Sequence, residues 1–171
     1  MKLKLLLIIM IILGIGVYSF FHMTEESVEK AVSKEIAETG YDRSKDPYEL
    51  VEVPDSDYYL AIYNDPNQML VMNVRSLWVG YAASIDSGIN LYDHIKKGSD
   101  HFYNNKLTFG TVEIPEGKIA TIDGEPVLTL ALGEYFKDTK FHADYKNLYF
   151  YHLKTPKEVN AGMFETIVEV E

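Results

Sequence analysis

The fold is decided by residues 58–74, which read YYLAIYNDPNQMLVMNV. Residues 58–63 and 69–74 are rich in the aromatic, β-branched and long apolar side chains that favour strands. The polar stretch between them, residues 64–68, contains Pro66 and has a length common for hairpin loops. This stretch therefore predicts two antiparallel strands that pair through a short connection.

Further strand patterns lie on both sides of this hairpin. Residues 48–53 predict a short edge strand, and residues 77–85 predict a third strand after the hairpin. Gly80, inside that third strand, indicates a bulge or a close approach of another backbone segment. Trp78 is the only tryptophan, and we expect its large side chain in the core, with a binding surface as the alternative place.

A second β-rich half follows residue 106. Between two of its strands, Asp123-Gly124 is a hairpin turn signal. Residues 84–106 are less regular, with a short helix expected over residues 90–97, and residues 135–146 read as a loop. The strand patterns of this half cover residues 107–114, 118–122, 127–132, 147–154 and 164–171.

One helix is expected ahead of the strands, over residues 24–39, with Thr24 as its N-cap and Gly40 as its terminator. Its apolar stripe is narrow, so it packs on the sheet or serves as a stalk, and binding to a partner is the alternative. We therefore expect an α+β fold, in which an N-terminal helix precedes a mostly antiparallel β-sheet domain of roughly seven to nine strands. Its two β-rich halves, residues 48–85 and 107–171, allow two sheets.

The start of the chain has the pattern of a membrane-targeting segment. Residues 5–21 read LLLIIMIILGIGVYSFF and carry no charge. A helix over them reaches about 26 Å at about 1.5 Å per residue, the short end of what crosses a bilayer. This predicts an uncleaved signal-anchor over residues 1–23. The alternatives are a cleaved signal peptide, for which the cleavage pattern is only partly met, and a buried core helix.

Orientation follows from the charges that flank this segment. Lys2 and Lys4 precede it, and basic residues stay on the cytoplasmic side of a membrane segment. We therefore expect a single-pass cell-membrane protein in which residues 24–171 form an extracytoplasmic domain. A cleaved leader would instead make the domain a secreted one.

The composition is compatible with an exported domain. The chain has 171 residues and no cysteine, which excludes disulfides, thiolate metal ligands and cysteine nucleophiles. Its formal charge of −10 argues against nucleic acid and anionic lipid as partners and permits a cationic partner or metal cations. A lysine-led leader with a small, acidic, cysteine-free domain resembles in layout the membrane-anchored exported proteins of Gram-positive bacteria. The resemblance covers the leader and the composition, and it implies a cell-surface location.

The sequence offers few candidates for chemistry. It contains no Gly-x-Ser-x-Gly motif, no glycine-rich phosphate loop and no His-Glu-x-x-His motif, and no cofactor is predicted. Histidines beside acidic residues are the candidate metal ligands, provided that their side chains converge. Solvated loop residues are the simpler interpretation. The candidate ligands are His94, His101, His142 and Asp144.

Thirteen tyrosines give the clearest indication of a binding surface. Tyr59 and Tyr63 occupy alternate positions of one predicted strand, as do Tyr149 and Tyr151 of another, so each pair shares a face. Aromatic faces stack on sugars, peptides and partner proteins, although a half-buried sheet also favours tyrosine. These four tyrosines and Trp78 are the candidate ligand-binding residues.

These patterns predict a non-catalytic binding domain at the bacterial cell surface, held in the membrane by residues 5–21. Its expected ligand is a protein or peptide of the envelope, and nucleic acid is not an expected partner. The alternative is a secreted or anchored hydrolase with a dispersed His/Asp or carboxylate site, and a third hypothesis is a structural subunit of a membrane complex. Convergence of the histidines in one pocket would favour the hydrolase. A tyrosine-lined groove or an exposed strand edge would favour the binding domain.

Overall fold

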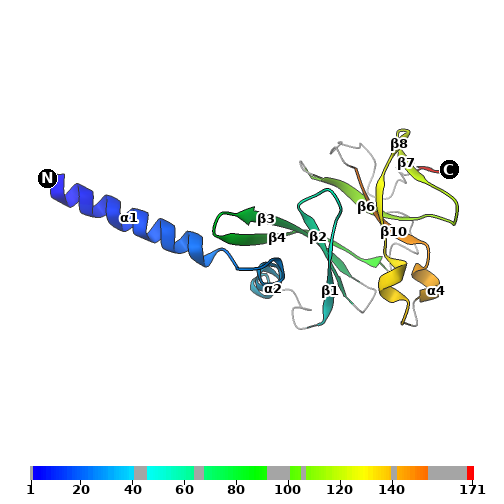
Figure 1. Ribbon diagram of the computed structural model, residues 1–171, viewed down its shortest axis with the longest axis horizontal. Coiled ribbons are helices and arrows are strands. Elements are labelled where there is room, and N and C mark those ends of the chain that lie inside the picture. Colours follow the sequence, from blue (N-terminus) through cyan, green and yellow to red (C-terminus); the bar gives the residue numbers. More distant parts are fainter. Residues whose placement is uncertain are drawn as a thin grey trace. The chain divides into compact units, whose positions relative to one another are not determined.

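A computed structural model describes residues 2–40, 46–63, 68–91, 101–104, 107–139, 142–153 and 169–171, without the side chains of 2–7, 19, 20, 101–104 and 107. The chain has an α+β fold in which two helices precede mostly antiparallel sheets and two short helices lie between β9 and β10 (Figure 1). The helices are α1 Lys2–His22, α2 Val28–Glu38, the 3-10 helix η1 Gly133–Phe136 and α4 His142–Tyr145. The strands are β1 Tyr48–Glu52, β2 Tyr58–Tyr63, β3 Met69–Leu77, β4 Gly80–Ile89, β5 His101–Asn104, β6 Leu107–Glu113, β7 Ala120–Ile122, β8 Glu125–Pro126, β9 Leu128–Ala131, β10 Leu148–His152 and β11 Glu169–Val170.

The strands form three sheets. Their orders are β1-β2-β3-β4, β5-β6-β10-β9 and β11-β7-β8. The pairs β1–β2, β5–β6, β6–β10, β9–β10, β7–β8 and β7–β11 are antiparallel. The predicted α+β class and its two β-rich halves are therefore confirmed. The described residues form eleven strands, more than the expected seven to nine, because β5 and β8 are strands of four and two residues in segments that show no strand pattern in the sequence.

The chain divides into two compact units. Unit 1 comprises residues 1–45 and 72–85, and unit 2 comprises residues 46–71 and 86–171. The boundary therefore runs through β3 and β4 and does not follow the sheets. Each unit is described separately below.

In unit 1, α2 begins later than predicted. Ser27 has extended backbone geometry, and its Oγ accepts a hydrogen bond from the Lys30 amide at 3.3 Å, so Ser27 is the N-cap. Thr24 instead donates its hydroxyl hydrogen to the carbonyl oxygen of Phe21 at 3.3 Å, so the predicted cap at Thr24 was wrong. At the other end, Gly40 has a φ of +65°, the left-handed conformation expected of a helix terminator.

The segment predicted as a third strand, residues 77–85, contains a hairpin turn. Leu77 ends β3, Gly80 begins β4, and Trp78 lies in the turn between them. Trp78 is 83% exposed, so the expectation of a core position was wrong. Gly80 has a φ of +145°, and a β-carbon there would overlap the carbonyl oxygen of Glu25, which confirms the predicted close backbone approach.

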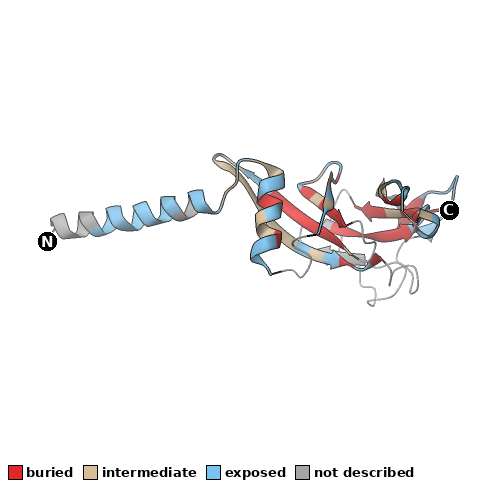
Figure 2. Cartoon of the chain, turned by 90° about the horizontal axis from the view of Figure 1, so that it is seen from below, coloured by how far each residue is buried: buried red, intermediate tan, exposed pale blue. Residues whose placement is uncertain are grey.

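The main core of unit 2 is aromatic and aliphatic, and Figure 2 shows that most of the buried residues lie on strands. Residues 135–146, predicted as a loop, contribute η1 and α4 to this core. Phe136 and Tyr145 are both buried, with ring centroids 5.0 Å apart. Gly133 allows this packing, because a β-carbon there would lie 2.7 Å from the Tyr145 carbonyl oxygen.

The predicted turn at Asp123-Gly124 is confirmed. Asp123 has a φ of 50° and Gly124 a φ of 77°, and two successive positive φ angles are the mark of a type I′ hairpin turn. This turn joins β7 to β8, whereas β9 pairs with β10. Of two other predicted elements, the helix over residues 90–97 falls outside the described residues beyond Leu91, and the strand over residues 164–171 is described only from Glu169 onward.

Helix α1 is exposed and apolar. The exposed side chains are Ile8, Ile9, Met10, Ile11, Ile12, Leu13, Ile15, Val17, Tyr18 and Phe21. In the part of the chain that the structure describes, no helix combines the length and the apolar character needed to cross a membrane. The predicted segment, residues 5–21, includes residues 5–7, 19 and 20, whose side chains lie outside that part.

Candidate functional site

Two hollows in the surface of unit 2 share three lining residues, Ile114, Glu116 and Tyr149. The first, which we name the Pro126 hollow, has a volume of about 330 Å³ and is also lined by Pro126, Val127 and the loop that precedes β7. The second, the His142 hollow, has a volume of about 450 Å³ and is also lined by His142. Tyr149 therefore contributes to both hollows, which makes its ring the natural centre of a binding surface.

Strand β10 holds Tyr149 in this place. Tyr149 pairs with Val112 of β6 on one side and with Ala131 of β9 on the other, so its backbone is fixed by both neighbours. Leu148 and Phe150 point into the main core, whereas Tyr149 and Tyr151 pack in a second cluster with Val112. The predicted shared face of the two tyrosines is thus confirmed. Tyr151 is fully buried and Tyr149 is half-buried, so only the latter presents ring surface to a ligand.

The hollows carry charges of both signs. Glu116 lines both of them, Lys118 lines the Pro126 hollow, and Glu134 and Lys146 line the His142 hollow. Glu134 also lies 3.8 Å from Lys137, but both side chains are well exposed, so this pair adds little stability and leaves the carboxylate accessible.

His142 lies at the wall of its hollow in a half-buried position. Its Nδ1 atom is buried and has no hydrogen-bond partner among the described residues. A buried imidazole nitrogen without a partner is costly, so a ligand group that reaches this atom would gain a hydrogen bond.

Within unit 2, the predicted ligand-binding residues Tyr59 and Tyr63 do not line the hollows beside Tyr149. Tyr63 is fully buried, and its ring lies 5.7 Å from that of Tyr48. Tyr59 is half-buried on the same strand, and neither tyrosine lines either of these hollows. Trp78 belongs to unit 1.

The predicted metal ligands are described only in part. His94 and the side chain of His101 lie outside the described residues, while His142 is half-buried and Asp144 is exposed. Among the residues that are described, no group of three or more histidine and acidic side chains could hold a metal ion. A hydrolytic or metal site that uses these histidines stays a prediction.

Two features of the chain were not singled out from the sequence. His152 ends β10 and is 2% exposed, and burial lowers its pKa, while the backbone of Leu153, the Asp55 carboxylate and the backbone of Pro54 act in the opposite direction. The position of His152 within the apolar strand pattern of residues 147–154 was the signal that could have indicated its burial. The other is Ser27-Val28-Glu29-Lys30, a Ser-x-x-Lys arrangement, in which Ser27 caps α2 and Lys30 pairs with Glu26.

Comparison of the chain with protein-family models, with curated protein sequences and with solved structures finds no match.

Proposed function

We propose that this chain is a membrane-anchored, extracytoplasmic binding domain whose ligand is a segment of protein or peptide. The observation that carries the proposal is the position of Tyr149, which lines two adjoining hollows from a strand paired on both sides. A rigid aromatic side chain between two depressions supplies a large contact area at little entropic cost.

The hollows favour a short peptide segment over a compact small molecule. Side chains at alternate positions of an extended segment point to the same side, and the two hollows, which share Tyr149 as a lining residue, offer one depression for each of two such side chains. Pro126 and Val127 supply an apolar wall for one of them. Glu116 and Glu134 would pair with a basic side chain at the other, in keeping with the acidic character of the chain.

Helix α1 supports the membrane part of the proposal. Residues 8–13 are exposed and consecutive, so they cover more than one helical turn and every side of the helix is apolar. A helix that is apolar all round is stable when an apolar environment surrounds it. With Lys2 and Lys4 before it, such a helix anchors the domain with its bulk outside the cytoplasm.

The binding surface is tested by site-specific photo-crosslinking in the native cells. A photoreactive phenylalanine analogue at position 149 should give a discrete protein or peptide adduct after irradiation. The matched control places the same analogue at Asp138, which is exposed in unit 2 and lines neither hollow. Equal adducts from both positions, or none from position 149, would contradict the proposed surface.

The anchor is tested by the mass of the mature protein in fractionated cells. The intact mass in the membrane fraction is the expected result. Loss of the first 20 or so residues, with the protein in the medium, would show a cleaved leader and a diffusible domain.

A further inference from the structure

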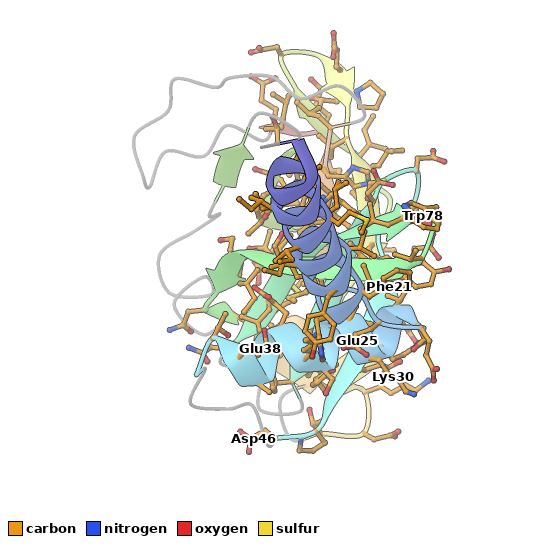
Figure 3. All side chains as sticks on the ribbon, turned by 90° about the vertical axis from the view of Figure 1, so that its left-hand side faces the viewer. Phe21, Glu25, Lys30, Glu38, Asp46 and Trp78 are labelled. Carbon is orange, nitrogen blue, oxygen red and sulfur yellow. The ribbon has the colours of Figure 1, made fainter. Side chains whose placement is uncertain are left out.

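The exposed tryptophan of unit 1 lies against the end of α1. Trp78 is 83% exposed in the turn between β3 and β4, and Phe21 is 52% exposed in the last turn of α1. Their ring centroids are 6.1 Å apart, with an edge-to-face angle of 71° (Figure 3). The hairpin tip and the helix end thus form one exposed aromatic surface.

Backbone hydrogen bonds fix the hairpin to the segment that leaves α1. The amide of Glu25 donates to the Tyr81 carbonyl at 2.8 Å, and the amide of Tyr81 donates to the Glu25 carbonyl at 2.8 Å. This approach requires Gly80, since any β-carbon there would overlap the Glu25 carbonyl oxygen. Backbone contacts therefore fix the position of Trp78 beside the helix end, and this position does not depend on the tryptophan side chain itself.

Lys34 of α2 strengthens the same junction. Its Nζ atom lies 2.9 Å from the carboxylate of Glu25 and donates a hydrogen bond to the carbonyl oxygen of His22. That carbonyl is one of the last four of α1, which have no partner within the helix. A half-buried cation at this end also interacts favourably with the helix dipole.

The aromatic residues at this junction have the chemistry of a membrane interface. Tryptophan and tyrosine prefer the headgroup region, because their rings are apolar and their N–H or O–H groups reach water. Tyr18 and His22 lie one turn apart on α1, with ring centroids 4.5 Å apart and a hydrogen bond of 2.6 Å between Tyr18 Oη and His22 Nε2. Trp78 extends this aromatic group from α1 onto the hairpin.

We propose that the tip of the β3–β4 hairpin, residues 77–79, is a second membrane contact in which Trp78 lies in the interfacial region of the bilayer beside Phe21. The inference rests on the proposed anchoring by α1, and it adds a lipid-facing surface on a part of the folded domain that is far from α1 in the sequence. The partner is the bilayer interface itself.

The contact is apolar in character. Glu25 and Glu26 precede α2 beside the junction and Glu29 lies in its first turn, so anionic headgroups are not attracted there. The contact should therefore form on zwitterionic lipid and persist at high salt, unlike a contact made by a basic patch.

The sole tryptophan allows a direct test on the full chain. The protein is reconstituted into phosphatidylcholine vesicles with either unmodified or brominated acyl chains. We expect Trp78 emission to shift to shorter wavelength relative to the detergent-free, lipid-free chain, to be protected from aqueous acrylamide, and to be quenched by the brominated lipid. Bromine close to the headgroup should quench more strongly than bromine near the chain ends.

The outcomes separate this inference from the anchor. If the chain floats with the vesicles but Trp78 is open to acrylamide and unaffected by brominated lipid, the hairpin contact is wrong and the anchor stands. If the chain does not float with the vesicles, both are wrong. The variant Gly80→Ala, which breaks the close approach to Glu25, should float with the vesicles yet show weaker bromine quenching, whereas Gly88→Ala in the same strand should match the wild type.

Discussion

The carbonyl oxygen of Glu25 occupies the space that a β-carbon on Gly80 would need. Gly80 also has a φ of +145°, a backbone angle that residues with a side chain rarely adopt. We expect Gly80→Ala to lower the free energy of unfolding by about 2 kcal/mol or more, because backbone strain and a clash with another backbone segment add together. Thermal unfolding followed by circular dichroism measures the change.

Gly88→Ala is the control for this prediction. Gly88 lies in the same strand, without a positive φ, and a β-carbon there would meet Leu70 Cδ2 at an ordinary 3.6 Å. The substitution should be neutral or stabilise the protein by about 0.5 kcal/mol, since alanine loses less chain entropy on folding. Equal losses for Gly80→Ala and Gly88→Ala would show that the contact with Glu25 is unimportant.

Ser27→Ala should destabilise the chain by about 1 kcal/mol, because it removes the side-chain oxygen that accepts from the Lys30 amide at the start of α2. Thr24→Ala should cost clearly less, since the Thr24 hydroxyl contacts only the Phe21 carbonyl at 3.3 Å. Thermal unfolding of the two variants compares them directly. A larger loss for Thr24→Ala would place the N-cap of the helix three residues earlier, as the sequence predicted.

Tyr58 and Asp86 link β2 to β4 through a hydrogen bond of 2.8 Å from the Tyr58 hydroxyl to Asp86 Oδ2. Tyr58→Phe should cost about 1 kcal/mol, because the hydroxyl comes from a buried side chain and its acceptor is charged. The double variant with Asp86→Ala should be less destabilised than the sum of the single variants, by about 0.5–1 kcal/mol. Additive losses in chemical denaturation would contradict a direct coupling.

His152 should make the stability depend on pH. Burial lowers its folded-state pKa below the unfolded value of about 6.5, so below that pH the unfolded chain binds more protons. The free energy of unfolding should therefore fall as the pH decreases from about 7 toward 5. Above this range both states are neutral and the effect is absent. Among the described residues, the Asp55 carboxylate acts on the pKa of His152 in the opposite direction, and it reduces the effect without reversing it.

His152→Phe keeps a ring of similar size and removes the titration. Its unfolding curves, measured with denaturant at a series of pH values, should show a smaller loss of stability on acidification than the wild type. The other four histidines are common to both proteins, so the difference between the two pH profiles reports His152 alone. Parallel profiles would contradict the assignment.

The strands within residues 58–63 and 69–74, which are neighbours in one sheet, and the turn at Asp123-Gly124 were predictable, because their local sequence and their tertiary environment favour the same structure. The turn between β3 and β4 was not predictable from the sequence. Trp78 and Val79 are strand-forming residues, and the turn depends on a contact between Gly80 and Glu25, which are 55 positions apart. Periodicity within a window cannot report such a contact.

The candidate site was likewise predictable only in part. Tyr149 was expected on a strand, with a face shared with Tyr151, and the structure has both features. Burial distinguishes the two residues, and it depends on which strands cover that face. His142 was noted for its acidic neighbour Asp144, whereas the structure places it at a hollow that also includes Tyr149, which lies in a different element.

Strand β1 ends its sheet, and in the described part of the chain no strand pairs with its outer edge. Glu49 and Glu52 are the exposed side chains of this strand. If the same edges of two copies met, four carboxylates would crowd into one short ribbon, and the repulsion would oppose the pairing. The edge therefore carries its own protection against aggregation, which matters most where many copies share one surface.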